Sequence, residues 1–124
     1  MTKWFYLILG GSVGTVTRYL FSGFIYEIAG TRFPYGTLAV NLLGCFLAGF
    51  LVAIAEEKFL FSPDIRVLLF VGFLGAFTTF STFILETANL IRDGQTFVAL
   101  GNVLGSVLLG FLVFRLGIIF GEII

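Results

Sequence analysis

Four long apolar stretches, separated by short polar segments, make up most of this chain. They cover residues 5–28, 37–55, 67–91 and 97–119. Each is close to or above the roughly 20 residues that an α-helix needs to cross the hydrocarbon core of a bilayer. Alternation of polar and apolar residues, which marks the strands of an outer-membrane barrel, is absent. Because helices satisfy their own backbone hydrogen bonds in lipid, the pattern predicts an all-α integral membrane protein with four transmembrane helices.

The composition supports this interpretation. Of the 124 residues, 59% are hydrophobic and only 11% are charged, whereas an average soluble domain has about 25% charged residues. The length predicts a single four-helix domain over residues 1–124. The 7 Lys and Arg balance 7 Asp and Glu, so the chain has no positive field to attract nucleic acid. There is no His and no cluster of metal ligands or paired carboxylates, so we expect no enzyme activity.

The basic residues are almost evenly divided between the two ends of the predicted helices. Four passes place both termini on one side, and the basic residues of that side are Lys3, Lys58, Arg66 and Arg115. The other side has Arg32 and Arg92. So weak a bias allows insertion in both orientations, and hence an antiparallel homodimer, but also a single orientation set by the small excess. Four helices are too few to enclose a pore, so a function at the membrane midplane requires a dimer or larger.

The third apolar stretch has the most informative local pattern. Its residues 72–83 include two Gly, three Thr and one Ser. Gly permits unusual backbone angles, and Ser and Thr compete for backbone hydrogen bonds, so the segment predicts a helix break at mid-membrane. The alternative is an unbroken helix whose hydroxyls bond to the preceding turn. A break would leave free carbonyls that can hold a cation and free N–H groups that favour an anion.

Side chains just beyond the predicted break are candidates for anion contact. Phe80 and Phe83 are three residues apart and therefore share a helix face. Thr79, Thr82 and Glu86 follow a neighbouring stripe. The edge of a Phe ring is electropositive and can face an anion, although a core or lipid-facing position is the alternative for each ring.

Polar residues within the other three stretches are costly in lipid and therefore suggest function. Asn41 lies in the second stretch, and Asn102 and Ser106 lie in the fourth. Asn41 could instead make an ordinary interhelical hydrogen bond. Arg18 in the first stretch could line a vestibule, pair with an acid such as Glu86, or extend to the interface.

Small residues four apart predict places where helices approach closely. Such pairs are Gly10 and Gly14, Gly101 and Gly105, and Ser106 and Gly110.

Taken together, these residues resemble the Fluc/CrcB family of fluoride channels. The matching segments are Gly36-Thr37-Leu38-x-Val40-Asn41-x2-Gly44, Gly14-x3-Arg18-Tyr19, and residues 72–83 followed by Glu86. The resemblance extends over the whole chain. It implies a multi-pass protein of the cell (inner) membrane that forms an antiparallel, dual-topology homodimer with two fluoride pathways. It also implies passive efflux that lowers cytoplasmic fluoride, with lipid, fluoride and a second copy of the chain as partners.

The resemblance further implies roles for particular residues. Backbone carbonyls of Gly75 and Thr78 would hold a structural Na⁺ at the dimer interface, and Asn41 would donate to fluoride. Phe80 and Phe83 would present ring edges to the anion. The remaining pathway residues would be Thr79, Ser81, Thr82, Ser106, Glu86 near the end of the pathway and Arg18 in a vestibule. Asn102 departs from the family pattern, since a Tyr can occur there, and its role stays open.

Two other functions are compatible with four short spans. A proton-coupled exporter of cationic drugs needs a membrane-embedded acid, typically in its first span. Here that span has Arg18, and its acid, Glu27, lies at the edge of a loop. A non-transporting membrane scaffold would leave the polar residues of the third stretch without a purpose.

Overall fold

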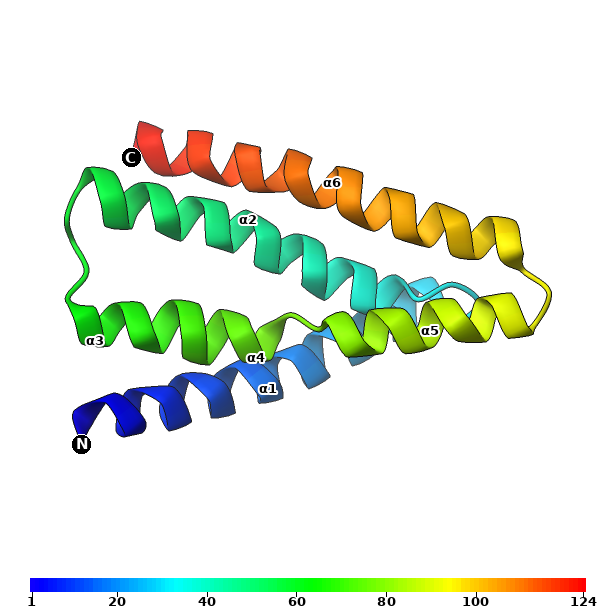
Figure 1. Ribbon diagram of the computed structural model, residues 1–124, viewed down its shortest axis with the longest axis horizontal. Coiled ribbons are helices and arrows are strands. Elements are labelled where there is room, and N and C mark those ends of the chain that lie inside the picture. The colour runs from blue at the N-terminus through cyan, green and yellow to red at the C-terminus, as the bar shows by residue number, and fades with distance from the viewer.

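The structure, a computed structural model, describes residues 1–124 and is all-helical (Figure 1). Its elements are α1 (Thr2–Ala29), α2 (Tyr35–Glu57), α3 (Pro63–Arg66), the π-helix η1 (Val67–Leu74), α4 (Gly75–Phe77), α5 (Phe80–Arg92) and α6 (Thr96–Ile123). Since α3, η1, α4 and α5 succeed one another along one pass, the chain makes four helical passes. Both termini lie at the same end of the bundle, as predicted (Figure 1).

Three of the four passes are long and apolar enough to cross a membrane: Tyr35–Glu57, Pro63–Arg92 and Thr96–Ile123. They coincide with the second, third and fourth predicted stretches, each extended slightly at both ends. The first pass, α1, has 28 residues but is more polar and is not one of these three. That α1 also crosses the membrane therefore stays a prediction.

Residues at the helix ends explain where the passes begin and stop. Gly30 adopts a φ of 87° after α1, a conformation that side chains with a Cβ rarely tolerate. At the other end of the bundle, the Ser62 hydroxyl accepts a hydrogen bond from the Ile65 N–H at 3.3 Å, and Pro63 begins α3. A side-chain cap followed by Pro is a common start for a helix.

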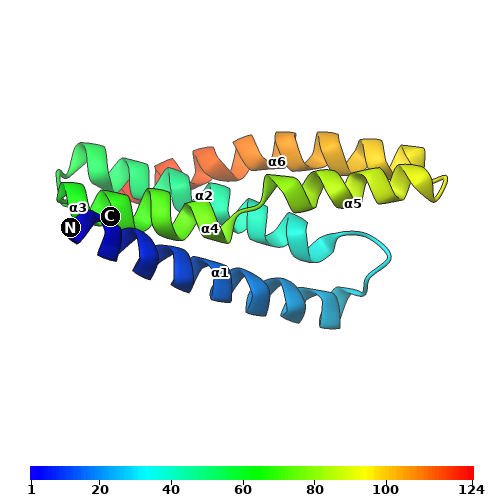
Figure 2. The same ribbon diagram turned by 60° about the horizontal axis from the view of Figure 1, so that its bottom comes forward.

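The passes pack as two close pairs. The first pass, α1, lies along η1 and α4, and α2 lies along α6 (Figures 1 and 2). Gly10 and Gly14 make the first contact possible, because a Cβ there would collide with the backbone carbonyls of Leu68 and Phe73 respectively. The predicted close approach at this glycine pair is confirmed.

The contact between α2 and α6 depends on glycines that the sequence analysis did not select. A Cβ on Gly49 would collide with the Phe114 carbonyl, and one on Gly117 would collide with the Phe46 carbonyl. By contrast, Gly101 and Gly105 have no atom within 4 Å of an added Cβ, so this predicted pair makes no close contact within one chain. Which glycines mediate packing therefore depends on which helix face meets a neighbour.

The third pass is not uniformly α-helical. Its first half consists of α3, the π-helix η1 and α4, and α4 ends at Phe77. Thr78 and Thr79 are extended, with φ and ψ of −86° and 155°, and −145° and 119°. A new helix, α5, begins at Phe80.

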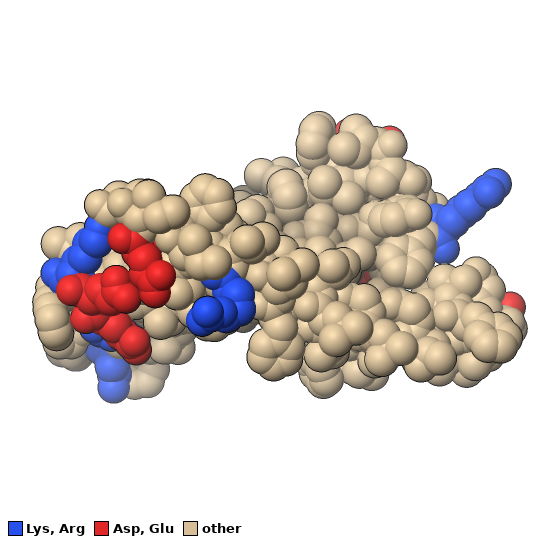
Figure 3. All heavy atoms as spheres, turned by 90° about the horizontal axis from the view of Figure 1, so that it is seen from above, with Lys and Arg blue, Asp and Glu red and all other residues tan.

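Little of the apolar surface is covered within one chain. Most large hydrophobic side chains of α1 and α6 are exposed, and Phe77 and Val40 are the largest fully buried ones. In Figure 3 the charged side chains gather mainly toward the two ends, leaving a broad region with few charges between them. Such a surface is expected of a protein whose helices face lipid or another copy of the chain.

Candidate functional site

Asn41 of α2 holds Thr79, the second of the two extended residues of the third pass, in place. Its Nδ2 donates to the Thr79 carbonyl at 3.0 Å, and its Oδ1 accepts from the Thr79 N–H at 2.8 Å. One side-chain amide thus satisfies both backbone groups of a residue that lies outside any helix. An amide nitrogen has two hydrogens, so Asn41 retains one donor for a further partner.

Thr79 also caps the start of α5. Its Oγ1 accepts a hydrogen bond from the Thr82 N–H at 3.3 Å and lies 3.1 Å from Thr82 Oγ1, to which it donates. The Thr78 hydroxyl donates to the Leu74 carbonyl at 2.9 Å. Ser81 is exposed, and its hydroxyl forms no hydrogen bond within the chain. Of these neighbouring hydroxyls, Ser81 and Thr82 therefore still have a hydrogen to donate to an external partner.

Two backbone carbonyls at the interruption accept no hydrogen bond. No N–H or side-chain donor in the chain bonds to the carbonyl of Gly75 or of Thr78. Both residues line an open groove of about 410 Å³, whose other lining residues are Asn41, Gly44, Cys45, Ala48, Phe70 and Leu74. Unpaired carbonyl oxygens are suitable ligands for a hard cation, so the two residues fit the Na⁺ ligands that the family resemblance implies.

Arg18 lies beside the same interruption. Its Nε donates to the Ala76 carbonyl at 2.9 Å, across the contact between α1 and α4. A cation at the C-terminal end of a helix is favourable because the last carbonyls carry partial negative charge. Arg18 does not pair with Glu86, one of the alternatives that the sequence left open.

Phe80 and Phe83 lie together at the beginning of α5. Their ring centroids are 5.9 Å apart, with an angle of 49° between the ring planes. The two rings differ sharply in burial, because Phe83 is 8% exposed and Phe80 is 75% exposed. Phe83 therefore belongs to the interior of one chain, whereas Phe80 lies on its surface.

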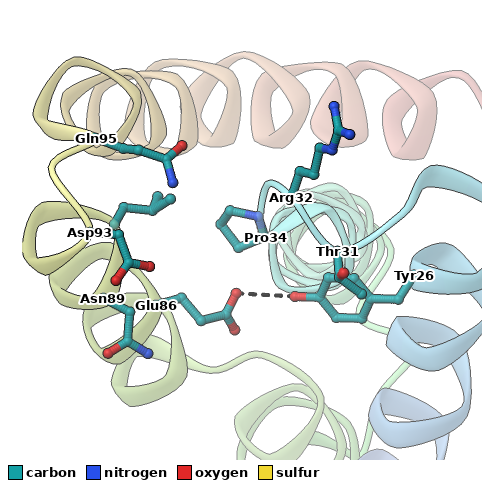
Figure 4. A pocket seen from close by; sticks show the side chains of 9 residues that line it. Tyr26, Thr31, Arg32, Pro34, Glu86, Asn89, Asp93 and Gln95 are labelled. Atoms are coloured by element: carbon teal, nitrogen blue, oxygen red, sulfur yellow. Dashed lines mark hydrogen bonds between the residues drawn. The ribbon is translucent and has the colours of Figure 1, made fainter.

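Glu86 lies one turn beyond Phe83 and faces a pocket of about 300 Å³ (Figure 4). Tyr26 of α1 donates from its hydroxyl to Glu86 Oε2 at 3.0 Å, and Thr37 of α2 donates to Glu86 Oε1. The other residues lining the pocket are Thr31, Arg32, Pro34, Asn89, Leu90, Asp93 and Gln95. Three passes thus meet at a single carboxylate.

Asn102 is a buried link between α5 and α6. It is 2% exposed, and its Nδ2 donates to Thr87 Oγ1 at 2.9 Å. Thr87 in turn donates to the Phe83 carbonyl at 2.7 Å, and Ser106 donates to Asn102 Oδ1 at 3.4 Å. Asn102 therefore connects α6, through Thr87, to the backbone of Phe83.

The structure brings the predicted residues into three groups. One group surrounds the interruption between α4 and α5, one surrounds Glu86, and one joins Phe83 to Asn102 and Ser106. Sequence reasoning missed Tyr26 and Thr87. Both are polar residues within apolar passes, and that property could have drawn attention to them.

Similarity to known proteins covers nearly the whole chain. The family described as CrcB-like protein, Camphor Resistance (CrcB), matches residues 5–118. A protein of Desulforapulum autotrophicum is 43% identical over 122 residues, which is 98% of both chains. A protein of Maridesulfovibrio salexigens is 40% identical over 124 residues, covering 100% of this chain and 98% of its own length. A protein of Geobacter sulfurreducens is 50% identical over 109 residues, which is 88% of both chains. Each of the three is named fluoride-specific ion channel FluC.

Proposed function

This chain belongs to the CrcB family, and from that premise we propose that it is a fluoride-specific ion channel. The observation that carries the proposal is that relatives with this name match the chain at 40–43% identity over almost their full length. The relatives' name describes a channel and not an enzyme, in agreement with the lack of catalytic clusters. Three apolar helical passes are consistent with a multi-pass membrane protein.

We infer that the working channel is an antiparallel homodimer with two pathways, in which α1 also crosses the membrane. Phe80 is three-quarters exposed and sits beside a buried pathway candidate, Phe83, so the site is open on one side within a single chain. A second copy could close it. The near balance of basic residues between the two ends is compatible with both orientations.

The site offers replacements for the water that surrounds a fluoride ion. The free amide hydrogen of Asn41 and the hydroxyls of Ser81 and Thr82 are donors, and the edges of Phe80 and Phe83 are electropositive. None of these groups carries a full positive charge. A small anion can therefore exchange its hydration for protein contacts and still leave, which conduction requires. A narrow path between rings would exclude the larger chloride ion.

We propose that Gly75 and Thr78 hold a structural Na⁺ between two copies of the chain. Their carbonyls are unpaired and both residues line the open groove, which supports this assignment. When bound, the ion would supply a fixed positive charge that the carbonyls of both chains share. Arg18 donates to the adjacent Ala76 carbonyl, so that oxygen already has a cationic partner.

We propose that flow is passive and lowers cytoplasmic fluoride. Proton-driven export requires an acid that can exchange its proton for the substrate inside the membrane. In α1 the charged residue at depth is Arg18, and Glu86 on α5 already accepts hydrogen bonds from two hydroxyls. The first pass therefore has no acid at depth for such an exchange.

The direct test is anion efflux from liposomes that contain the purified protein. We expect fluoride to be released much faster than from empty liposomes, with chloride release near the empty-liposome rate. A rate of fluoride efflux equal to that of empty liposomes, with folded protein present, would disprove the channel proposal. Comparable fluoride and chloride rates would refute selectivity.

Replacing the aromatic rings of Phe80 and Phe83 is expected to slow fluoride efflux. We expect Phe80→Ile and Phe83→Ile each to lower fluoride efflux by about tenfold, because one aromatic contact is worth up to about 1.5 kcal/mol. Phe97→Ile is the matched control, since Phe97 is 90% exposed at the start of α6 and remote from α5's first turn. Rates of both test variants equal to that of the control would remove the proposed role of the rings.

A further inference from the structure

The carboxylate of Glu86 is held by hydroxyls alone. Oε1 accepts from Thr37 and Oε2 accepts from Tyr26, and no Lys or Arg lies within ion-pair distance of either oxygen. Arg32 lines the same pocket, but its side chain points away from Glu86 (Figure 4). An ionised carboxylate can only accept hydrogen bonds, so its orientation here depends on these two donors.

The two hydroxyls have no hydrogen to spare. Tyr26 Oη and Thr37 Oγ1 lie 3.4 Å apart, and each has a single hydrogen. With both hydrogens directed at Glu86, neither hydroxyl can donate to a passing anion. The three side chains therefore form a closed triangle that joins α1, α2 and α5.

The position of this triangle relates it to the anion pathway. Glu86 is three residues after Phe83 on α5 and so lies on the same helix face. Its pocket opens at the end of the bundle where α1 connects to α2 and α5 to α6 (Figures 1 and 4). On the proposed pathway, an anion that moves from Phe83 toward this end passes close to the carboxylate, so the location of that negative charge affects how readily the anion leaves.

We propose that Tyr26 is a positioning residue that fixes the Glu86 carboxylate against the wall of this mouth and thereby sets the rate of fluoride passage. The inference rests on the proposed function. Tyr26 is suited to this task because its ring packs against Gly36, where an added Cβ would collide with it. The ring is thus fixed by packing and the hydroxyl by Glu86.

Without the Tyr26 hydroxyl, Oε2 would lose its donor, and Thr37 alone would hold the carboxylate through Oε1. Oε2 could then turn into the pocket. Asn89 and Gln95 line that pocket and offer amide donors on its opposite side. A negative charge drawn toward them would stand in the path of the anion. The expected consequence is slower passage with an intact aromatic site.

The test is a double-mutant cycle of Tyr26→Phe and Glu86→Gln, measured as fluoride current in planar bilayers over a range of fluoride concentrations. Tyr26→Phe keeps the ring that packs on Gly36, so folding is preserved. We expect it to lower the maximum current about tenfold, as for loss of a hydrogen bond to a charged group, while the half-saturating fluoride concentration changes little. In the Glu86→Gln background the same substitution should change the maximum current by less than about twofold.

Tyr6→Phe, also on α1, is the matched control because the Tyr6 hydroxyl makes no hydrogen bond within the chain. The current of this variant should equal that of the wild type.

The possible outcomes separate this inference from the proposed function. A conducting wild type with an unchanged Tyr26→Phe variant overturns the role of Tyr26 alone. An equal loss in the wild-type and Glu86→Gln backgrounds shows that Tyr26 does not act through Glu86 and overturns it as well. A wild type without fluoride current overturns the proposed function. In that event the wild type, the two single variants and the double variant can be compared by thermal unfolding in detergent. Additive effects of the two substitutions on the free energy of unfolding would also disprove the coupling between the side chains.

Discussion

Replacing Asn41 by Asp is expected to abolish fluoride conduction. The substitution preserves the shape of the side chain and its acceptor for the Thr79 N–H, but it removes the amide donor. A carboxylate oxygen would then face the Thr79 carbonyl oxygen, which Asn41 Nδ2 now approaches to 3.0 Å. It would also place a negative charge beside the proposed anion path. A buried group left unsatisfied costs about 1–3 kcal/mol, and the repulsion adds to that cost. We therefore expect efflux to fall by about a hundredfold or more.

The variant Asn41→Leu separates support of the interruption from the charge effect. It leaves both Thr79 backbone groups without their partner but introduces no charge. We expect the Leu variant to unfold at a lower temperature in detergent than the wild type and to conduct poorly. Liposome efflux and circular dichroism on both variants provide the measurement. Wild-type efflux from folded Asn41→Asp protein would contradict the proposed role of the Asn41 amide.

Replacing Gly117 by Ala is expected to destabilise the packed pair α2 and α6. The new Cβ would collide with the Phe46 carbonyl and lie 2.9 Å from the Phe50 backbone nitrogen. Backbone atoms cannot rotate away as a flexible side chain can, so α6 must shift from α2. Forcing an extra methyl group into a packed contact typically costs about 1–3 kcal/mol. The expected result is a lower unfolding temperature in detergent and a loss of fluoride efflux.

Gly23→Ala is the matched control for this substitution. Gly23 lies in α1, and no atom is within 4 Å of an added Cβ. We expect the unfolding temperature of this variant to equal or slightly exceed that of the wild type, since Ala favours a helix over Gly by up to about 1 kcal/mol. If Gly117→Ala were as stable as Gly23→Ala, the close contact between α2 and α6 would be wrong.

The arrangement of the third pass shows how far sequence reasoning extends. Gly, Ser and Thr within residues 72–83 favoured an interruption, and Thr78 and Thr79 are non-helical. The π-helix η1 was not predicted, because hydrogen bonds between residues five apart leave no recognisable residue pattern in an apolar run. Asn41 was selected as a polar residue at depth, but its double hydrogen bond to Thr79 depends on how α2 docks against the third pass.

The site residues divide in the same way. Arg18 and Glu86 were selected because charge within an apolar pass is costly, and yet their partners were not predictable. Ala76 lies 58 residues from Arg18, and Tyr26 lies 60 residues from Glu86. Nothing in the local sequence distinguishes the Ala76 carbonyl from its neighbours, or Tyr26 from the exposed Tyr19.

The sequence by itself determined the class of protein and the number and extent of its helical passes. Transfer of apolar side chains out of water and the internal pairing of backbone groups depend on local composition, so they can be judged residue by residue along the chain. Only the tertiary structure decided which glycines pack against backbone, that Asn41 supports Thr79, and that Tyr26 and Thr37 hold Glu86. These outcomes depend on helix rotation and on short-range contacts between distant segments, since hydrogen bonds and close packing require atoms to meet within a few ångströms.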